Sequence, residues 1–208
     1  MLLRKHVYSI FVLLLVLLCG AGWWSWKAVD AREREEEVRI ERYDRVLDEY
    51  VSLGSYSALH RMNTQYPTET KLLIEDVLKL GAVDEPHIEQ RLRHLYLDSA
   101  MQVLLDEVHR QYADLSDLEN DFRKAFEELR SVNSAFRTPY IYTQIACFGP
   151  SIVVRDTLIG ICLDKYLGSD FPLYRDHFSD EQRARMNRAD IVPDALRLYL
   201  QLSHDSQP

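Results

Sequence analysis

The chain has 208 residues, of which 47% are hydrophobic and 28% are charged. This length and composition indicate one globular domain with an appendage, and they exclude a disordered or fibrous chain. No acidic residue precedes Asp30, so residues 30–208 carry 22 basic against 33 acidic side chains, a net charge of −11. A body this acidic is a poor surface for nucleic acid, and we expect no nucleic-acid partner.

The first 29 residues predict a membrane segment. Residues 7–26 contain no charged side chain, and a helix of that length spans about 30 Å, one hydrocarbon thickness. Two basic residues precede the run, and three tryptophans stand at its far end, where indole rings favour the headgroup level. We therefore expect a signal anchor in the lipid bilayer: a single-pass inner-membrane protein whose C-terminal body faces the periplasm.

Two other fates of this segment stay open. Signal peptidases cut after small residues, whereas Val16, Leu17 and Leu18 are bulky. Cleavage is therefore one alternative to an uncleaved anchor. Lipidation of Cys19 is the other, and it would make the protein a lipoprotein, although Leu18 is a weak match to a lipobox.

Residues 30–53 predict a charged stalk helix that leads into the body, because they are dense in charge and free of Gly and Pro until Gly54. The body domain is expected to span residues 54–208. Its first part predicts a helical array, because apolar residues recur at spacings of three and four. These helices are expected over residues 54–66, 69–80, 86–97 and 99–112 and after Ser116, where Ser116 and Glu119 spell a capping box.

The hydrophobic period changes after Pro139. Three short runs rich in β-branched and aromatic residues follow, and they predict a small antiparallel meander over residues 140–147, 151–154 and 158–163. Two further helices are expected after it, one capped by Ser179 and Gln182 and one with Pro193 in its first turn. The predicted fold class is α+β and mostly helical, with one N-terminal transmembrane helix.

Complete catalytic and metal-binding motifs are absent from the sequence. The seven histidines form no H-E-x-x-H, and His87 and His94 would lie about 10.5 Å apart along a helix, too far to share one ion. There is also no C-x-x-C, no G-x-S-x-G and no glycine-rich phosphate loop, so we expect no cofactor. Cys147 and Cys162 form a disulfide if their strands are neighbours; two buried free thiols are the alternative.

A cluster of acidic, aromatic and glycine residues follows the third predicted strand. Its members are Asp164, Tyr166, Gly168, Asp170, Pro172 and Tyr174, with Arg185 nearby in sequence. Polar groups at a strand end commonly line functional sites, which makes this cluster the candidate interaction site. The alternative is a structural loop, in which aspartates accept backbone N–H groups and aromatic rings cover the core.

The sequence from residue 159 to 174, IGICLDKYLGSDFPLY, resembles the gliding motility GldB family of Bacteroidota. Residues 140–147, Arg185-Met186 and residues 191–194 carry the resemblance too, which extends over about residues 38–200. It implies an envelope protein exported across the inner membrane, in a lineage that supports gliding and type IX secretion. Family members are usually lipoproteins, which bears on Cys19. They also continue with a further helical segment, so we expect this chain to lack any function housed there.

The same family is similar to zinc metallopeptidases, whose H-E-x-x-H would fall near residues 191–197. In that register Pro193 and Arg197 stand where the imidazole ligands would be, and neither binds zinc. The resemblance thus implies a non-catalytic accessory or structural protein, a pseudoenzyme or scaffold that contacts other envelope proteins. The alternatives are a degenerate zinc-peptidase-like hydrolase and a periplasmic ligand-binding module.

Overall fold

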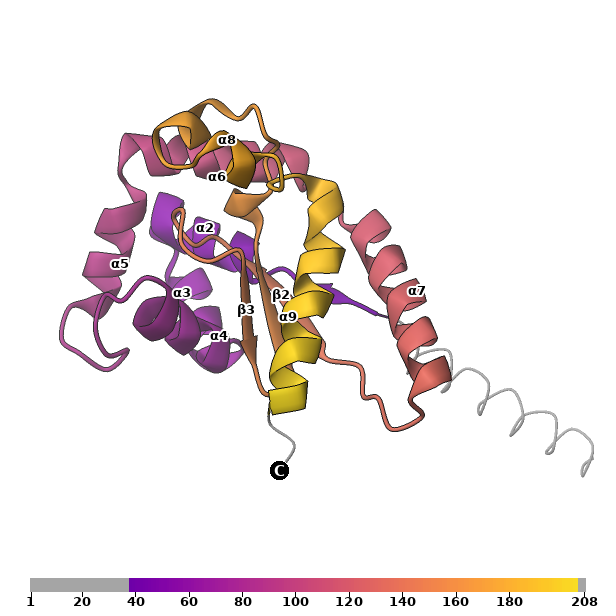
Figure 1. Ribbon diagram of the computed structural model, residues 1–208. Coiled ribbons are helices and arrows are strands. Elements are labelled where there is room, and N and C mark those ends of the chain that lie inside the picture. Colours follow the sequence, from indigo (N-terminus) through magenta and orange to yellow (C-terminus); the bar gives the residue numbers. More distant parts are fainter. Residues whose placement is uncertain (1–37, 206–208) are drawn as a thin grey trace, which may run out of the picture. The chain divides into compact units, whose positions relative to one another are not determined.

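A computed structural model describes residues 38–205 of the chain (Figure 1). The predicted membrane segment and Cys19 lie outside these residues, as does the predicted stalk up to Glu37. Within the described part of the chain, no helix is long and apolar enough to cross a bilayer. Residues 39–205 belong to one compact unit, the body.

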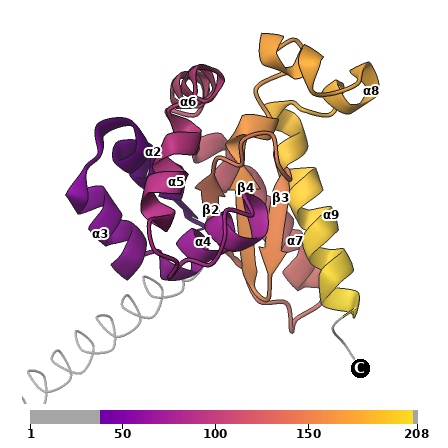
Figure 2. The ribbon, with the colours of Figure 1, turned by 90° about the vertical axis from the view of Figure 1, so that its left-hand side faces the viewer.

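The body is mostly helical, as the hydrophobic period predicts, and it contains a small sheet. Figure 2 shows the sheet between two groups of helices, with α2 to α5 on one side and α7 and α9 on the other. The long helices are α2 (Tyr43–Leu53), α3 (Tyr56–Thr64), α5 (Ile88–Tyr96), α6 (Ser99–Gln111), α7 (Ser116–Val132) and α9 (Ile191–Asp205). The short helix α4 (Pro67–Lys71) continues into a π-helical segment, η1 (Leu72–Val77).

Local signals explain several helix ends. Gly54 ends α2 in the left-handed region, at φ 67°, a conformation that glycine adopts without steric cost. The Ser55 side chain then accepts the Ala58 N–H and begins α3. Pro67 stands in the first turn of α4, where its missing N–H costs nothing.

The prediction of one helix over residues 30–53 is wrong at residues 40 and 41. Strand β1 (Ile40–Glu41) forms there and pairs in parallel with β2 (Tyr140–Gln144), so α2 begins only at Tyr43. Two long-range bonds hold β1: the Ile40 N–H donates to the Glu119 carboxylate at 3.0 Å, and the Thr143 hydroxyl donates to the Glu41 carbonyl at 3.2 Å. Tertiary contacts outweigh the weak local helix preference of these residues.

The bond between the Ile40 N–H and Glu119 also shows that the predicted capping box at the start of α7 is wrong. Glu119 binds β1 instead of reaching back to the helix cap, and Ser116 bonds to Asp114 through its N–H at 3.1 Å and its hydroxyl at 2.7 Å. The second predicted capping box is confirmed, because the Ser179 side chain accepts the Gln182 N–H and Gln182 bonds back to the cap. It begins the short helix α8 (Asp180–Arg183).

The sheet is mixed, so the predicted antiparallel meander is wrong. Its order among the described residues is β1-β2-β4-β3, with β4 (Leu158–Cys162) parallel to β2 and antiparallel to the edge strand β3 (Ile152–Arg155). Residues 141–144 and 159–162 are buried without alternation. Such continuous burial is typical of parallel strands covered by helices on both faces. The connection over residues 145–151 is long enough for β3 to pass beyond β4.

The connection from β4 to α9 lies at one end of the sheet (Figure 1, top). It contains the turns η2 (Leu163–Lys165), η3 (Pro172–Asp176) and η4 (Arg188–Asp190), together with α8. The predicted cluster lies on this connection. The ends of β4 and α9 therefore position the candidate site.

Candidate functional site

Asp164 joins two loops at the end of the sheet. It follows β4 directly and has an exposed fraction of 0%. Its carboxylate accepts the Ala146 N–H at 2.7 Å and the Phe148 N–H at 2.9 Å, both from the loop after β2. Burial raises the pKa of Asp164 above its ordinary value, while the two amide groups oppose that rise. Asp164 is thus a structural anchor for the loop over residues 145–151.

Tyr174 extends the same framework. It is completely buried; its hydroxyl donates to the Asp164 carbonyl at 2.6 Å and accepts the Leu167 N–H at 3.0 Å. The Gly168 N–H donates to the Met186 carbonyl at 2.9 Å, and Gly168 holds φ at +103°, which a side chain would disfavour. The predicted cluster therefore contains a hydrogen-bonded framework made by Asp164, Gly168 and Tyr174.

The structure separates the remaining cluster members. Asp170 is exposed to solvent, and Pro172 begins η3 with its ring exposed. Tyr166 and Arg185, in contrast, approach the same carboxylate on α9. The predicted cluster is therefore divided into a framework, an exposed loop, and two residues that meet at one point.

That point is Asp194, in the first turn of α9. The Tyr166 hydroxyl donates to Asp194 Oδ2 at 3.2 Å, and Asp194 Oδ1 accepts from Arg185 Nη2 at 3.0 Å and Arg197 Nη2 at 2.8 Å. The Asp194 side chain is only 12% exposed, whereas both arginines are largely exposed. Burial raises the pKa of Tyr166, so its hydroxyl stays protonated and donates at neutral pH. Residues 191–194 carry part of the family resemblance, but no sequence motif marks Asp194 as a site residue.

A small cavity of about 180 Å³ opens beside this carboxylate. We call it the Lys165–Asp194 pocket, lined by Ser151, Lys165, Tyr166, Phe178, Gln182, Arg185, Met186 and Asp194. The Lys165 ammonium lies 3.7 Å from the centre of the Phe178 ring, a cation–π contact. Partial burial lowers the pKa of Lys165 below its ordinary value. The pocket thus combines two cationic groups, hydroxyl groups and an apolar wall.

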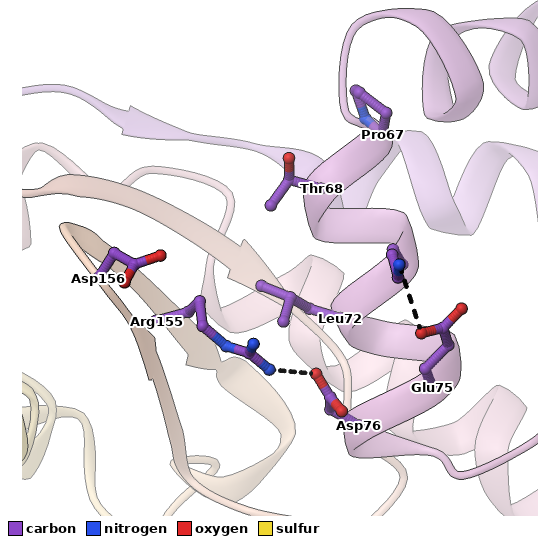
Figure 3. Close-up of a pocket in the computed structure, with 8 residues that line it drawn as sticks. Pro67, Thr68, Leu72, Glu75, Asp76, Arg155 and Asp156 are labelled. Atoms are coloured by element: carbon purple, nitrogen blue, oxygen red, sulfur yellow. Dashed lines mark hydrogen bonds and ion pairs between the residues drawn. The ribbon is translucent and has the colours of Figure 1, made fainter. Parts of the chain in front are cut away.

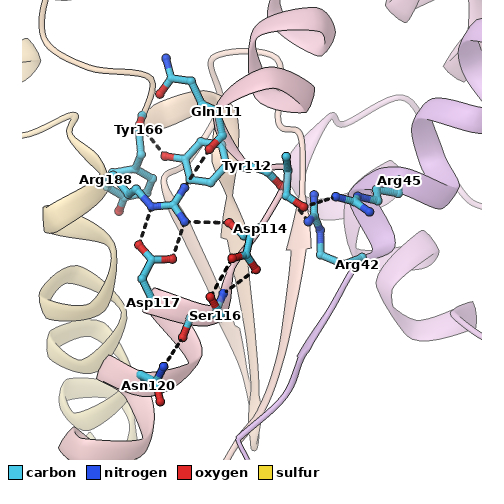
Figure 4. Close-up of polar contacts among 11 residues, drawn as sticks. Arg42, Arg45, Gln111, Tyr112, Asp114, Ser116, Asp117, Asn120, Tyr166 and Arg188 are labelled. Carbon is cyan, nitrogen blue, oxygen red and sulfur yellow. Dashed lines mark hydrogen bonds and ion pairs between the residues drawn. The ribbon is translucent and has the colours of Figure 1, made fainter.

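Arg188 holds the start of α9 in place (Figure 4). Its guanidinium donates to the Asp117 carboxylate and to the carbonyls of Gln111 and Asp114, at 2.5 to 3.0 Å. It also lies over the Tyr112 ring, 4.7 Å from the centroid. The Tyr112 hydroxyl donates to the Tyr166 carbonyl at 2.5 Å. These contacts connect the loop between α6 and α7 to the backbone that carries Tyr166, and to the turn before Asp194.

A larger groove of about 580 Å³ lies between the α4–η1 segment and the turn that joins β3 to β4 (Figure 3). Two ion pairs line it, Arg155 with Asp76 at 2.7 Å and Lys71 with Glu75 at 3.8 Å. The charges of these two pairs compensate one another, and Asp156 adds one further negative charge to the groove. The predicted cluster lies elsewhere, on the connection from β4 to α9.

Cys147 and Cys162 are free thiols in the structure. Cys162 is completely buried and its sulfur accepts from Gln144 Nε2 at 3.3 Å. Burial raises the pKa of Cys147 to about 12, so this thiol is protonated at neutral pH. Among residues 38–205, no group of three or more His, Cys, Asp and Glu side chains is placed to hold a metal ion.

The chain matches a known family over most of its length. The family model of the gliding motility protein GldB covers residues 25–207, which include the framework and the whole Lys165–Asp194 pocket. No curated protein and no solved structure matches the chain. The family match confirms the resemblance found at residues 159–174. The chain belongs to the gliding motility GldB family.

Proposed function

We propose that this protein is a membrane-attached accessory component of the cell envelope that supports gliding or type IX secretion through contacts with other proteins. Membership of the GldB family supports the link to gliding motility. The family model is named for a lipoprotein, which favours attachment through a lipid on Cys19 over a single transmembrane anchor. In either case the body would lie on the periplasmic side of the inner membrane.

One observation carries the non-catalytic interpretation. The buried polar groups of the motif bind the chain itself: the Asp164 carboxylate and the Tyr174 hydroxyl are both engaged with backbone groups. A catalytic acid or base needs access to a substrate, whereas these groups are enclosed. The surface next to this cluster is a charged rim, formed by Asp194 and the two exposed arginines bonded to it, Arg185 and Arg197. Such a rim suits recognition of another protein.

A genetic experiment tests this proposal in the native cell. We expect deletion of the gene to impair gliding or type IX secretion, and the variant Arg185→Glu to do the same at a normal protein level. Arg175→Glu is the matched control, because Arg175 is an exposed cation on η3 outside the pocket. Normal gliding and secretion in the deletion strain would contradict the proposal.

A photocrosslinking experiment tests for direct contact. Benzoylphenylalanine at Ala184, an exposed position next to Arg185, should give a discrete adduct with an envelope protein. The same probe at Ser134, exposed in the loop after α7, is the control. Mass spectrometry of the mature N-terminus separates a lipidated Cys19 from an uncleaved anchor. A zinc-dependent peptidase activity of the purified chain would overturn the non-catalytic interpretation.

A further inference from the structure

We propose that the Lys165–Asp194 pocket binds a carboxylate group of a partner polypeptide, with Lys165 and Arg185 as the two cations that recognise it. This inference rests on the proposed function, because it takes the partner to be a protein. It adds the chemical class of the group that enters the pocket.

Lys165 supplies the first argument. Its ammonium is half-buried against the Phe178 ring, and it forms no ion pair with any residue in the described part of the chain. The neighbouring Asp164 carboxylate is occupied by two backbone amides. Half-buried charges are normally paired, because desolvation of an isolated ion is costly. Asp164 attracts the Lys165 ammonium without bonding to it, so an acidic group from outside the chain would supply the direct contact that Lys165 lacks.

The charge balance of the rim points the same way. Asp194 is the carboxylate among the pocket residues, and both of its oxygens are engaged, Oδ1 by Arg185 and Arg197 and Oδ2 by Tyr166. Arg185 and Arg197 neutralise this anion, which leaves Lys165 as the pocket cation without a bonded carboxylate, on a chain whose formal net charge is −8. The Arg185 guanidinium uses one terminal nitrogen for Asp194 and keeps further N–H groups for a second carboxylate.

The size and walls of the pocket narrow the ligand class. Its volume of about 180 Å³ lies below the roughly 300–1,000 Å³ typical of small-molecule sites. A single acidic side chain or a chain terminus needs less room than such a ligand. Phe178 and Met186 form an apolar wall against which the methylene or backbone part of that residue can pack. A partner polypeptide meets both requirements, one carboxylate with apolar atoms behind it.

Peptide binding to the purified full-length protein in non-ionic detergent tests the proposal. The probes are four fluorescent pools of octapeptides with random flanks: a central Glu or a central Gln with an amidated C-terminus, and a free or an amidated C-terminus without acidic side chains. Anisotropy should show binding about tenfold tighter for one carboxylate pool than for its neutral twin. The pool that binds identifies whether the carboxylate is a side chain or a chain terminus.

Variants locate the binding on the molecule. Lys165→Met keeps an apolar contact with Phe178 and removes the charge, and it should weaken carboxylate binding about tenfold. Arg175→Met removes an exposed cation outside the pocket and should leave binding unchanged. Circular dichroism checks that both variants are folded. If Lys165→Met is unfolded, Arg185→Gln removes the other pocket cation and should weaken carboxylate binding about tenfold.

Several results would overturn the proposal. These are equal affinity for each carboxylate pool and its neutral twin, an equal loss in Arg175→Met, and displacement by inorganic phosphate but not by acetate. Each can occur while deletion of the gene still impairs gliding. A failed carboxylate pocket is therefore distinguishable from a failed accessory function.

Discussion

The guanidinium of Arg188 and the carboxylate of Asp117 lie 71 positions apart in the chain and face each other in a two-bond arrangement. Nε lies 2.8 Å from Oδ2, and Nη2 lies 2.5 Å from Oδ1 (Figure 4). The pair joins the turn before α9 to the first turn of α7. Because Asp194 follows that turn by four residues, the pair helps to position the carboxylate of the candidate site.

Replacement of Arg188 by Lys should therefore destabilise the protein. Lysine keeps the positive charge but cannot reproduce the two bonds to Asp117, the stacking on Tyr112 and the bonds to two carbonyls. The Asp117 side chain is 57% exposed, so screening leaves the ion pair itself a small contribution. The lost carbonyl bonds dominate, and we expect the free energy of unfolding to fall by about 1–3 kcal/mol in urea titrations.

Arg123→Lys is the control for this prediction. Arg123 pairs with Glu127 one turn away on the exposed face of α7, where the same substitution should change the free energy of unfolding by less than about 0.5 kcal/mol. Equal losses in the two variants would show that Arg188 acts only as an ordinary surface charge.

The raised pKa of Asp164 predicts that the free energy of unfolding depends on pH. Burial raises its pKa in the folded state above the ordinary value of 3.8. Between that value and the raised one the folded state binds more protons than the unfolded state, so the free energy of unfolding falls as pH rises through this window. Above the raised pKa the contribution of Asp164 stays constant. The variant Asp164→Asn carries no titrating group and should lose this slope.

Asp164→Asn also turns one amide donor toward a backbone N–H, in place of an acceptor for Ala146 or Phe148. We expect it to lower the free energy of unfolding by about 1–3 kcal/mol, with the larger loss at acidic pH, where the native group is neutral. Urea midpoints from pH 3 to pH 8 measure both effects. Asp170→Asn, on the exposed loop of the same motif, should leave the midpoints almost unchanged; an effect as large as that of Asp164→Asn would refute the framework.

A side chain at Gly160 should destabilise the protein. A Cβ atom at this position of β4 would lie 2.6 Å from the hydroxyl oxygen of Tyr142, whose ring covers the strand. Gly160→Ala should cost about 1–3 kcal/mol through overpacking. In a Tyr142→Leu background the same substitution should cost less, because the obstructing ring is gone. Additive effects in this double-mutant cycle would contradict the packing argument.

The sequence contains enough local information for the helices but too little for the pairing of the strands. Spacings of three and four residues predict most of the helical array, and the Ser179 and Gln182 cap is confirmed. Strand order depends instead on long-range pairing: β4 enters between β2 and β3 and pairs in parallel with β2. Residues 141–144 are buried without alternation, but Thr143 and Gln144 are polar, so the sequence shows no continuous apolar run that would indicate a strand covered on both faces.

The same distinction explains what was missed in the site. The local spacing identifies Tyr166 and Arg185 as candidates, but their common partner Asp194 follows Tyr166 by 28 positions. Asp194 also pairs with Arg197, three residues later on α9. Charged pairs at this spacing are frequent in helices, so the spacing alone is weak evidence for a functional site. Glu119 shows the converse error. Its spacing from Ser116 fits a capping box, whereas its carboxylate binds Ile40, 79 positions away.

The two buried tyrosines of the motif should differ in what their hydroxyl groups contribute. Tyr174→Phe leaves the Leu167 N–H and the Asp164 carbonyl without their buried partner, and should lower the free energy of unfolding by about 1–3 kcal/mol. Tyr166→Phe removes one 3.2 Å bond to Asp194, which keeps both arginines, so we expect a loss of about 0.5–1.5 kcal/mol. Urea titration of the two variants under identical conditions compares them directly, and a greater loss in Tyr166→Phe would reverse the assignment of framework and site.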